Sequence, residues 1–259
     1  MNDNELVLLD VDGGVATITL NRSRAQNAFD GALARRLSEI VRRVMKNDTV
    51  RVVVLRGNGP AFCIGADLAT FFRHRGDPSP MVREILGDLN EVSLALREGG
   101  RLVISSIHGR TVGIGLSLAI QADFCIAADT TTLTPAYALL GLPPDGGATR
   151  AAAERIGIRR AIQLYLGEQT LDADRGLELG LIDRLVPAAE LEQATRELSN
   201  RLAQNSADAI LHTKALLRQS MSTPHAVQLF AEMEAIIDCM GTEFYRTELR
   251  KRIQTILQS

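Results

Sequence analysis

Tryptophan is absent from the chain, and aromatic residues make up only 4% of its 259 residues. The core must therefore be built from aliphatic side chains, and a hydrophobic content of 46% is enough for a sizeable one. An excess of one charge is lacking too, because 29 lysines and arginines face 31 aspartates and glutamates, for a net charge of −2. Nucleic acid and anionic membranes attract strongly positive surfaces, so neither is expected as a partner.

Cysteine, histidine and long apolar runs are also scarce. Cys63, Cys125 and Cys239 are odd in number and far apart, which favours free thiols in a reducing compartment over a disulfide framework. The four histidines are scattered, so no metal site is expected. No apolar run approaches the length that spans a bilayer, and the acidic N-terminus has no apolar signal core. We therefore expect a cytoplasmic protein.

Strand and helix patterns alternate in the first part of the chain. Short apolar, often β-branched runs predict strands at 6–10, 15–20, 52–55, 102–107 and 124–127. Segments with helical periodicity lie between them, which predicts an α/β layer with crossover connections. Most of the chain from residue 158 on reads as helix. We expect an α/β core over residues 1–190 and a helical oligomerisation region over 191–259.

One amphipathic segment of the C-terminal region has two interpretations. Phe230, Met233, Ile237 and Met240 fall on one stripe of a predicted helix. Such a stripe either covers the core of the same subunit or contacts another copy of the chain. Because both arrangements bury the same residues, the sequence alone leaves them equally open.

Two glycine-containing segments are each placed between a predicted strand and a predicted helix. Residues 62–68 read FCIGADL and residues 108–116 read HGRTVGIGL. Turns of this kind leave backbone N–H groups unpaired, and two such donors on one carbonyl oxygen would stabilise an enolate or a tetrahedral adduct. Asp145, on the turn GLPPDGG, supplies a carboxylate that could move a proton. The combination favours thioester chemistry over simple binding.

The order and spacing of these segments resemble the crotonase superfamily, the enoyl-CoA hydratases and isomerases. The motifs that carry the resemblance are Leu20-Asn21-Arg22, Gln26-Asn27-Ala28, residues 61–68, His108-Gly109, residues 121–127 and residues 178–183. The resemblance covers residues 7–186 and continues weakly into the C-terminal helices. It implies a spiral of ββα units with a helical C-terminal region, and a homotrimer or dimer of trimers. It further implies an acyl-CoA thioester substrate, with no cofactor beyond the coenzyme A of that substrate.

The resemblance also implies the residues of the site. It places an oxyanion hole at the backbone N–H groups of Ala66 and Ile114, with Asp145 as the catalytic carboxylate. The residues that it implies as substrate contacts are Arg24, Ala25, Gly65, Asp67, Leu68, Gly113, Ser117, Tyr137 and Leu142. Ile114 departs from the family, which commonly has three successive glycines here, and a β-branched residue resists positive φ. For Asp67 and Asp145 the alternative role is that of a helix N-cap.

The acids decide which reaction is expected. Hydratases of this family hold a water between two glutamates, and those positions fall on Ser117 and Tyr137, neither of which is a carboxylate. Asp145 matches the acid of several dienoyl- and enoyl-CoA isomerases. It also matches the nucleophile of 4-chlorobenzoyl-CoA dehalogenase, whose helper histidine falls on Asn90. We expect an enoyl-CoA double-bond isomerase; the alternatives are an enoyl-CoA hydratase with atypical acids and a non-catalytic acyl-CoA-binding subunit.

Overall fold

The structure is a computed structural model that describes residues 5–168 and 170–258. The chain divides into two compact units, with the boundary between Ala203 and Gln204. The first unit holds both sheets and the candidate site, and the second holds the last three helices.

A six-stranded sheet with the order β1-β2-β3-β4-β6-β9 forms the centre of the first unit. An antiparallel hairpin opens it, and the strands after β2 add in parallel. Its strands are β1 (Val7–Asp12), β2 (Val15–Leu20), β3 (Val52–Gly57), β4 (Leu102–Ile107), β6 (Phe124–Ala128) and β9 (Arg184–Val186). A smaller sheet contains β5 (Arg110–Val112), β7 (Thr132–Thr134) and β8 (Leu171–Asp172).

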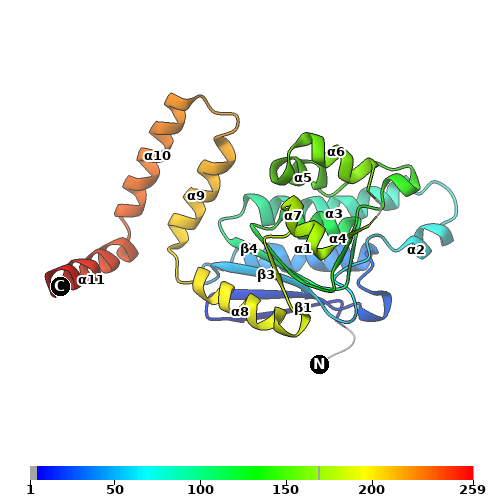
Figure 1. Cartoon of the computed structure of the whole chain (residues 1–259), viewed down its shortest axis with the longest axis horizontal. Coiled ribbons are helices and arrows are strands. Elements are labelled where there is room, and N and C mark those ends of the chain that lie inside the picture. Colours follow the sequence, from blue (N-terminus) through cyan, green and yellow to red (C-terminus); the bar gives the residue numbers. More distant parts are fainter. Residues whose placement is uncertain (1–4, 169, 259) are drawn as a thin grey trace. The chain divides into compact units, whose positions relative to one another are not determined.

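Helices connect these strands, as the alternating pattern predicts (Figure 1). They are α1 (Gly31–Met45), α2 (Leu68–Arg73), α3 (Ser79–Glu98), α4 (Ile114–Gln121), α5 (Ala148–Ile156), α6 (Ile158–Leu166), α7 (Ala173–Leu179) and α8 (Leu191–Leu202). Three short 3₁₀ turns lie at Ser23–Ala25, Ala138–Leu140 and Ala188–Glu190.

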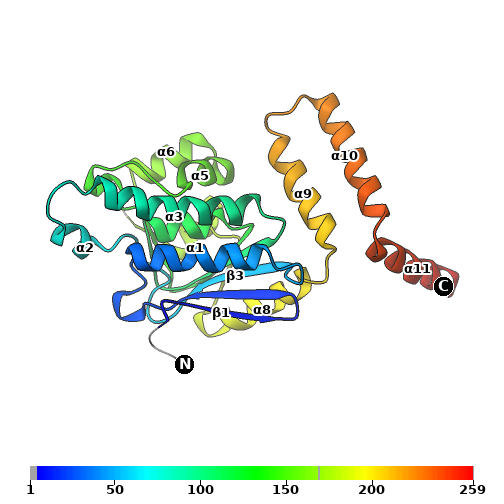
Figure 2. The ribbon, with the colours of Figure 1, turned by 180° about the vertical axis from the view of Figure 1, so that it is seen from behind.

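Alternate residues of the central strands enter two different cores, because successive side chains of a strand point to opposite faces of the sheet. On β3, Val53 and Leu55 pack into the core that contains α1 and α3, whereas Val52 and Val54 pack into the core that contains α8. Both helix layers are visible from the back in Figure 2. All residues of α4 are buried, and its sequence is accordingly apolar apart from Ser117 and Gln121.

The unit boundary differs from the expected division at residue 190. Helix α8 belongs to the first unit because Leu191, Ala194 and Leu198 are buried against the sheet, in the same core as Val52. The helical region beyond the boundary consists of α9 (Ala207–Gln219), α10 (His225–Met240) and α11 (Glu243–Gln258).

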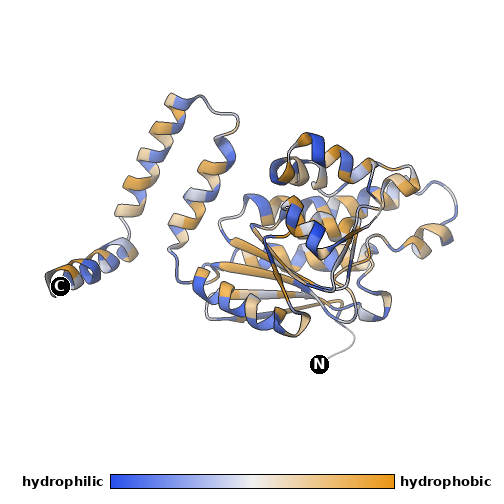
Figure 3. Cartoon of the chain, viewed as in Figure 1, coloured by the Kyte–Doolittle hydropathy of each residue, from blue (hydrophilic) through white to orange (hydrophobic). Residues whose placement is uncertain are grey.

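Helix α10 exposes the stripe that the sequence predicts. Phe230 is 67% exposed, and Met233, Ile237 and Met240 are about half exposed. Orange apolar turns alternate with blue polar ones along this helix in Figure 3. Within the described part of the chain, no helix is both long enough and apolar enough to cross a membrane.

Candidate active site

Ala66, the first candidate oxyanion donor, lies in a loop that pairs with residues 26–29. Phe29 donates its N–H to the oxygen of Gly65 at 2.7 Å, and Asp67 donates its N–H to the oxygen of Phe29 at 2.8 Å. The peptide groups on both sides of Ala66 are therefore fixed. Among residues 5–168 and 170–258, no acceptor takes a hydrogen bond from the Ala66 N–H. Gly65 has a φ of +89°, a conformation that a residue with a side chain rarely adopts.

Asn27 braces this loop, a role that the sequence does not predict. It is fully buried, and its side-chain amide donates to the carbonyl oxygens of Asn58, Ala61 and Phe62 at 2.9, 2.9 and 3.1 Å. Its side-chain oxygen accepts the N–H of Arg22 at 2.9 Å. A buried amide with all its groups paired holds its neighbours in one arrangement. Its presence in the motif Gln26-Asn27-Ala28 was the only signal that could have indicated this role.

Asp67 caps the helix that follows the loop, as one of its two interpretations predicts. Its carboxylate accepts the N–H groups of Ala69 and Thr70 at the start of α2, and it pairs with Arg22 at 2.8 Å. Burial raises the pKa of Asp67, but the hydrogen bonds and the charge of Arg22 outweigh burial and hold it below its ordinary value. Arg22 also donates to the oxygen of Ala28, so it ties both ends of the loop together.

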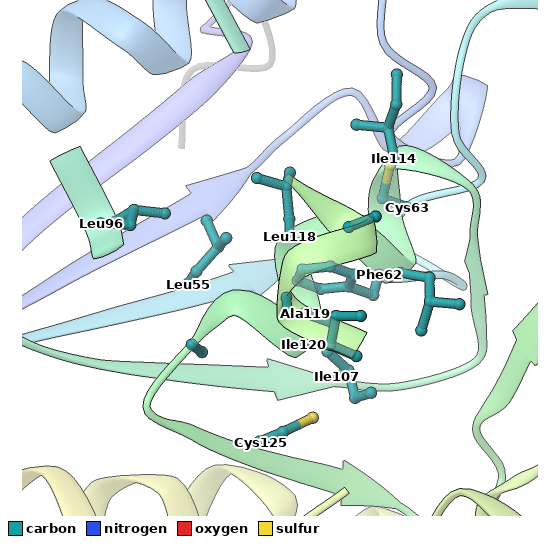
Figure 4. Packing of buried hydrophobic residues seen from close by; sticks show 14 of the residues in the cluster. Leu55, Phe62, Cys63, Leu96, Ile107, Ile114, Leu118, Ala119, Ile120 and Cys125 are labelled. Carbon is teal, nitrogen blue, oxygen red and sulfur yellow. The ribbon is translucent and has the colours of Figure 1, made fainter. Parts of the chain in front are cut away.

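Ile114, the second candidate donor, is the first residue of α4. The first N–H groups of a helix have no partner within it, and the Ile114 N–H has no acceptor in the described part of the chain. The positive φ at this turn, +52°, belongs to Gly113, whose N–H donates to the oxygen of Thr134 at 2.9 Å. The β-branched side chain therefore meets no strain. It is 5% exposed and points away from Phe62 at the start of the helix (Figure 4).

The two donor segments lie side by side. Val112 donates its N–H to the oxygen of Cys63 at 2.9 Å. A Cβ placed on Gly65 would lie 3.1 Å from the Val112 oxygen and 3.8 Å from the Cα of Gly113. Because each donor residue directly follows one of these two glycines, the unpaired N–H groups belong to neighbouring backbone segments. This is the arrangement that a shared oxyanion requires.

Asp145 is connected to the second segment by a chain of hydrogen bonds. The Tyr137 hydroxyl donates to Asp145 Oδ1 at 2.7 Å, and the Ser117 hydroxyl lies 2.9 Å from the Tyr137 hydroxyl. Ser117 Oγ is also 3.1 Å from the carbonyl oxygen of Gly113. Three residues that the resemblance assigns to the site thus form one connected network. Ser117 and Tyr137 are 1% and 7% exposed, so water is largely kept from it.

The alternative role of Asp145 as a helix N-cap is not found. Helix α5 begins at Ala148 with Gly147 as its N-cap, and no side chain caps it. The Ala148 N–H bonds to the backbone oxygen of Asp145 at 3.0 Å, and the carboxylate is left for Tyr137.

Gln121 is a second bracing residue that the sequence does not predict. Its side-chain amide, 8% exposed, donates to the oxygen of Ser117 at 2.8 Å and to the oxygen of Gly146 at 2.6 Å. The Ser93 hydroxyl donates to the Gln121 side-chain oxygen. Since Gly146 follows the candidate acid directly, this amide fastens the turn that carries the acid to the last turn of α4.

Burial raises the pKa values of the titratable side chains in and beside this network. It raises the pKa of Asp145 above its ordinary value, and the hydrogen bond from Tyr137 only partly offsets this. Burial, followed by the charge of Asp145, raises the pKa of Tyr137 and also that of Tyr165, whose ring meets the Tyr137 ring edge-on at 6.1 Å. Both phenols therefore stay neutral, and Asp145 is the titrating group of the network. A carboxylate whose pKa moves towards neutrality is suited to exchange protons.

The remaining predicted contacts lie on exposed segments. Arg24 and Ala25 are in the 3₁₀ turn beside the donor loop, and Arg24 is exposed. Leu68 and Leu142 are 55% and 56% exposed, one directly after the donor loop and the other before Asp145. A bound substrate would cover these apolar side chains and remove them from water.

A hollow of about 690 Å³ lies elsewhere on the described surface. It is lined mainly by residues of β1, β2 and α8, with none of the site residues among them. The paired backbone donors and the acid do not converge on this hollow, so it lacks the groups of the candidate site. Within the described ranges, no group of three histidine, cysteine or acidic side chains could hold a metal ion.

Comparison with known proteins agrees with this architecture. The sequence model of the enoyl-CoA hydratase/isomerase family matches residues 10–249. A trans-2-decenoyl-(acyl-carrier-protein) isomerase of Streptococcus mutans is 33% identical over 84% of this chain and 83% of its own. A short-chain-enoyl-CoA hydratase of Clostridium acetobutylicum is 28% identical over 92% of this chain and 90% of its own.

Solved structures lead to the same fold. The enoyl-CoA hydratase of Bacillus anthracis superposes with a TM-score of 0.90 at 26% identity, covering 97% of both chains. A Thermobifida fusca protein assigned as an enoyl-CoA hydratase, in complex with acetoacetyl-CoA, superposes with a TM-score of 0.84 at 33% identity, covering 91% of this chain and 94% of its own. The crotonase-like α/β fold predicted from the sequence is thereby confirmed, and the chain belongs to the enoyl-CoA hydratase/isomerase family.

Proposed function

We propose that the protein is an enoyl-CoA double-bond isomerase in which Asp145 moves the proton while the N–H groups of Ala66 and Ile114 hold the thioester oxygen. The observation that carries the proposal is the row of close polar contacts, Asp145 to Tyr137 at 2.7 Å, Tyr137 to Ser117 at 2.9 Å and Ser117 to Gly113 at 3.1 Å, which leads from this carboxylate to the Gly113–Ile114 peptide. These contacts support the proposal because they connect the proposed acid to the peptide that carries one of the proposed donors.

The reaction needs few groups. One carboxylate removes a proton from C2 of a 3-enoyl thioester, the electron pair moves onto the thioester oxygen as a dienolate, and the same carboxylate returns the proton at C4. The double bond then lies between C2 and C3. Two N–H donors stabilise the intermediate charge, and removal of one such donor typically costs about 10²–10³ in rate.

Hydration is the second candidate, because the relatives include both isomerases and hydratases. It requires a base to activate water and an acid to protonate carbon. The positions that carry glutamates in hydratases hold Ser117 and Tyr137, and their hydroxyls are occupied with each other and with Asp145. With one carboxylate, isomerisation is the better supported reaction, and non-catalytic acyl-CoA binding is the third candidate.

An acyl-CoA is the proposed substrate. A relative of known structure binds acetoacetyl-CoA, and the turn between Tyr137 and Asp145 exposes apolar side chains that an acyl chain would cover: Leu139, Leu140 and Leu142. Burial of such side chains is worth about 25 cal/mol per Å².

Product analysis distinguishes the three candidates. The protein is incubated with a 3-enoyl-CoA and, separately, with a 2-enoyl-CoA, and the products are identified by chromatography and mass spectrometry. An isomerase interconverts the two without change in mass, a hydratase adds one water to the 2-enoyl-CoA, and a binding subunit converts neither. Formation of 3-hydroxyacyl-CoA without double-bond migration would contradict the proposal.

The raised pKa of Asp145 predicts the pH dependence of the reaction. The base must be ionised, so kcat/KM falls as the pH drops through the pKa of Asp145, which burial places above that of an ordinary aspartate. Tyr137→Phe removes the hydrogen bond that lowers this pKa, so the acidic limb moves to higher pH. Tyr165→Phe is the control, because its hydroxyl contacts Ala148 at 3.3 Å and not the acid. An unmoved limb in Tyr137→Phe would contradict the assignment of the limb to Asp145.

We also propose that the exposed stripe of α10 is a contact between copies of the chain in a homotrimer or dimer of trimers. Association would remove the exposed side chains of this helix from water, which is favourable for apolar surface: Phe230, Met233, Ile237 and Met240. Light scattering of the purified protein is expected to give the mass of three or six chains, and Phe230→Asp to lower it. A monomer at micromolar concentration would refute this arrangement.

A further inference from the structure

The hydrogen-bond chain that ends at Asp145 begins at the peptide group that carries one of the oxyanion donors. Ser117 Oγ lies 3.1 Å from the carbonyl oxygen of Gly113, and the N–H of the same peptide belongs to Ile114. The carbonyl of Gly113 also accepts the Ser117 N–H at 2.9 Å. A hydrogen bond to the oxygen of a peptide polarises it and makes its N–H a stronger donor.

The Ser117 hydroxyl has one hydrogen and two acceptors within reach, the Tyr137 oxygen at 2.9 Å and the Gly113 oxygen at 3.1 Å. While Asp145 is ionised, Tyr137 donates to it at 2.7 Å, because a charged acceptor gives the stronger bond. The Tyr137 oxygen is then the better acceptor for Ser117, since a donating hydroxyl accepts more strongly. In this state the Gly113 oxygen receives no hydrogen from the side chain.

Once Asp145 is protonated, this direction of the hydrogen bonds along Ser117, Tyr137 and Asp145 is no longer favoured. A neutral carboxyl attracts the Tyr137 hydrogen less and can itself donate to the phenol oxygen. Tyr137 then donates to Ser117, and Ser117 donates to Gly113. Each hydroxyl keeps its own hydrogen and only rotates, so the one proton transferred is that from substrate carbon to Asp145.

We propose that Ser117 and Tyr137 couple the protonation of Asp145 to the strength of the Ile114 oxyanion donor. The inference rests on the proposed function. The donor becomes stronger at the moment when Asp145 has taken the proton and the thioester oxygen has become negative. Ser117 and Tyr137, placed where hydratases carry glutamates, thus act as positioning residues for the isomerisation.

Only Asp145 titrates within this network. The titratable side chains that face it are the phenols of Tyr137 and Tyr165, and burial together with the Asp145 charge keeps both neutral. A change with pH near the pKa of Asp145 therefore reports on this acid.

The test is infrared spectroscopy of a saturated probe, hexanoyl-CoA labelled with ¹³C at the thioester carbonyl, which has no allylic proton to lose. Bound to the unaltered protein, its carbonyl band is expected to lie at lower frequency than in water. The band should move lower still as the pH falls through the pKa of Asp145. In Ser117→Ala the shift on binding remains, but its pH-dependent part shrinks. We expect kcat to fall roughly fivefold, the effect of one hydrogen bond.

Ser105→Ala is the matched control. Ser105 is a fully buried serine whose hydroxyl donates to another carbonyl of α4, that of Ala119, at 2.8 Å. It should lose stability and keep the full pH-dependent shift. If Ser117→Ala does not fold, Tyr137→Phe breaks the chain at its next link and should show the same loss, with Tyr165→Phe as its control.

The outcomes separate this inference from the proposed function. A carbonyl band that does not shift on binding would overturn the oxyanion hole itself. A band that shifts on binding, with the same pH dependence in Ser117→Ala and in the unaltered protein, would overturn the coupling and leave the isomerase proposal intact.

Discussion

Asp145→Asn is expected to lower the rate of 3-enoyl to 2-enoyl isomerisation by about 10²–10⁴-fold, the usual effect of losing general acid–base catalysis. Asparagine keeps the size of the side chain and can still pair with Tyr137, but it cannot take a proton at neutral pH. Binding of acyl-CoA should persist. With the unaltered enzyme in D₂O, deuterium is expected at C2 or C4 of the product unless the carboxyl group is fully shielded from solvent.

Stability provides an independent check on this variant. Burial raises the folded-state pKa of Asp145 above its unfolded value. The stability that this shift contributes is fully present below the unfolded pKa and is lost as the pH rises through the folded pKa. At pH 7 the ionised carboxylate is therefore a cost, and Asp145→Asn should be at least as stable as the unaltered protein by thermal denaturation.

Asp172→Asn is the control for the substitution itself. Asp172 caps α7 by accepting the N–H of Arg175 at 2.8 Å, and asparagine caps nearly as well. We expect full activity in this variant. If Asp145→Asn also retained near-full turnover, the carboxylate would have no catalytic role.

Gly115→Ala is expected to cost about 10² in rate although it alters no reacting group, because a displacement of about 1 Å at a catalytic donor has an effect of this size. A Cβ at this position would lie 2.9 Å from the Cβ of Cys63 and closer still to the Cys63 carbonyl oxygen. The start of α4, which carries the Ile114 N–H, would have to move away from the neighbouring segment. Overpacking of this kind also lowers the free energy of unfolding by about 1–3 kcal/mol.

Gly87→Ala is the control that distinguishes the displacement of α4 from the general effect of replacing a helical glycine by alanine. Gly87 lies within α3, where an added Cβ meets nothing within 4 Å. This variant should be stabilised by about 0.5–1 kcal/mol, measured by denaturant unfolding, with kcat unchanged. Gly115→Ala with full activity would show that the position of α4 does not matter for the reaction.

The sequence predicts the parts of the site that depend on local pattern. Each glycine segment comes between a strand and a helix, and the structure puts Gly65 and Gly113 in contact at positive φ. The objection to Ile114 disappears because the glycine before it carries the unusual backbone conformation. Asp67 as a helix cap follows from residue type and position alone.

Features that depend on contacts between distant segments could not be predicted in this way. Two sets of contacts join α4 to the turn that carries Asp145, which follows β6 and β7 along the chain. They are the hydrogen bond from Gln121 to Gly146 and the contacts through Ser117 and Tyr137, and no local sequence pattern encodes them. The place of α8 in the first unit depends on such contacts as well. The apolar stripe of α8 has the same spacing as that of any amphipathic helix. Only its contact with the sheet shows that this helix belongs to the first unit.

A crystal structure of the protein with bound hexanoyl-CoA tests the central claim most directly. The account predicts that the thioester oxygen lies about 2.7–3.1 Å from the nitrogens of both Ala66 and Ile114, the range of a hydrogen bond to an oxyanion. It also predicts that a carboxylate oxygen of Asp145 faces C2 and C4 of the acyl chain. A thioester oxygen bound by neither N–H, or an acyl chain that runs away from Asp145, would contradict it.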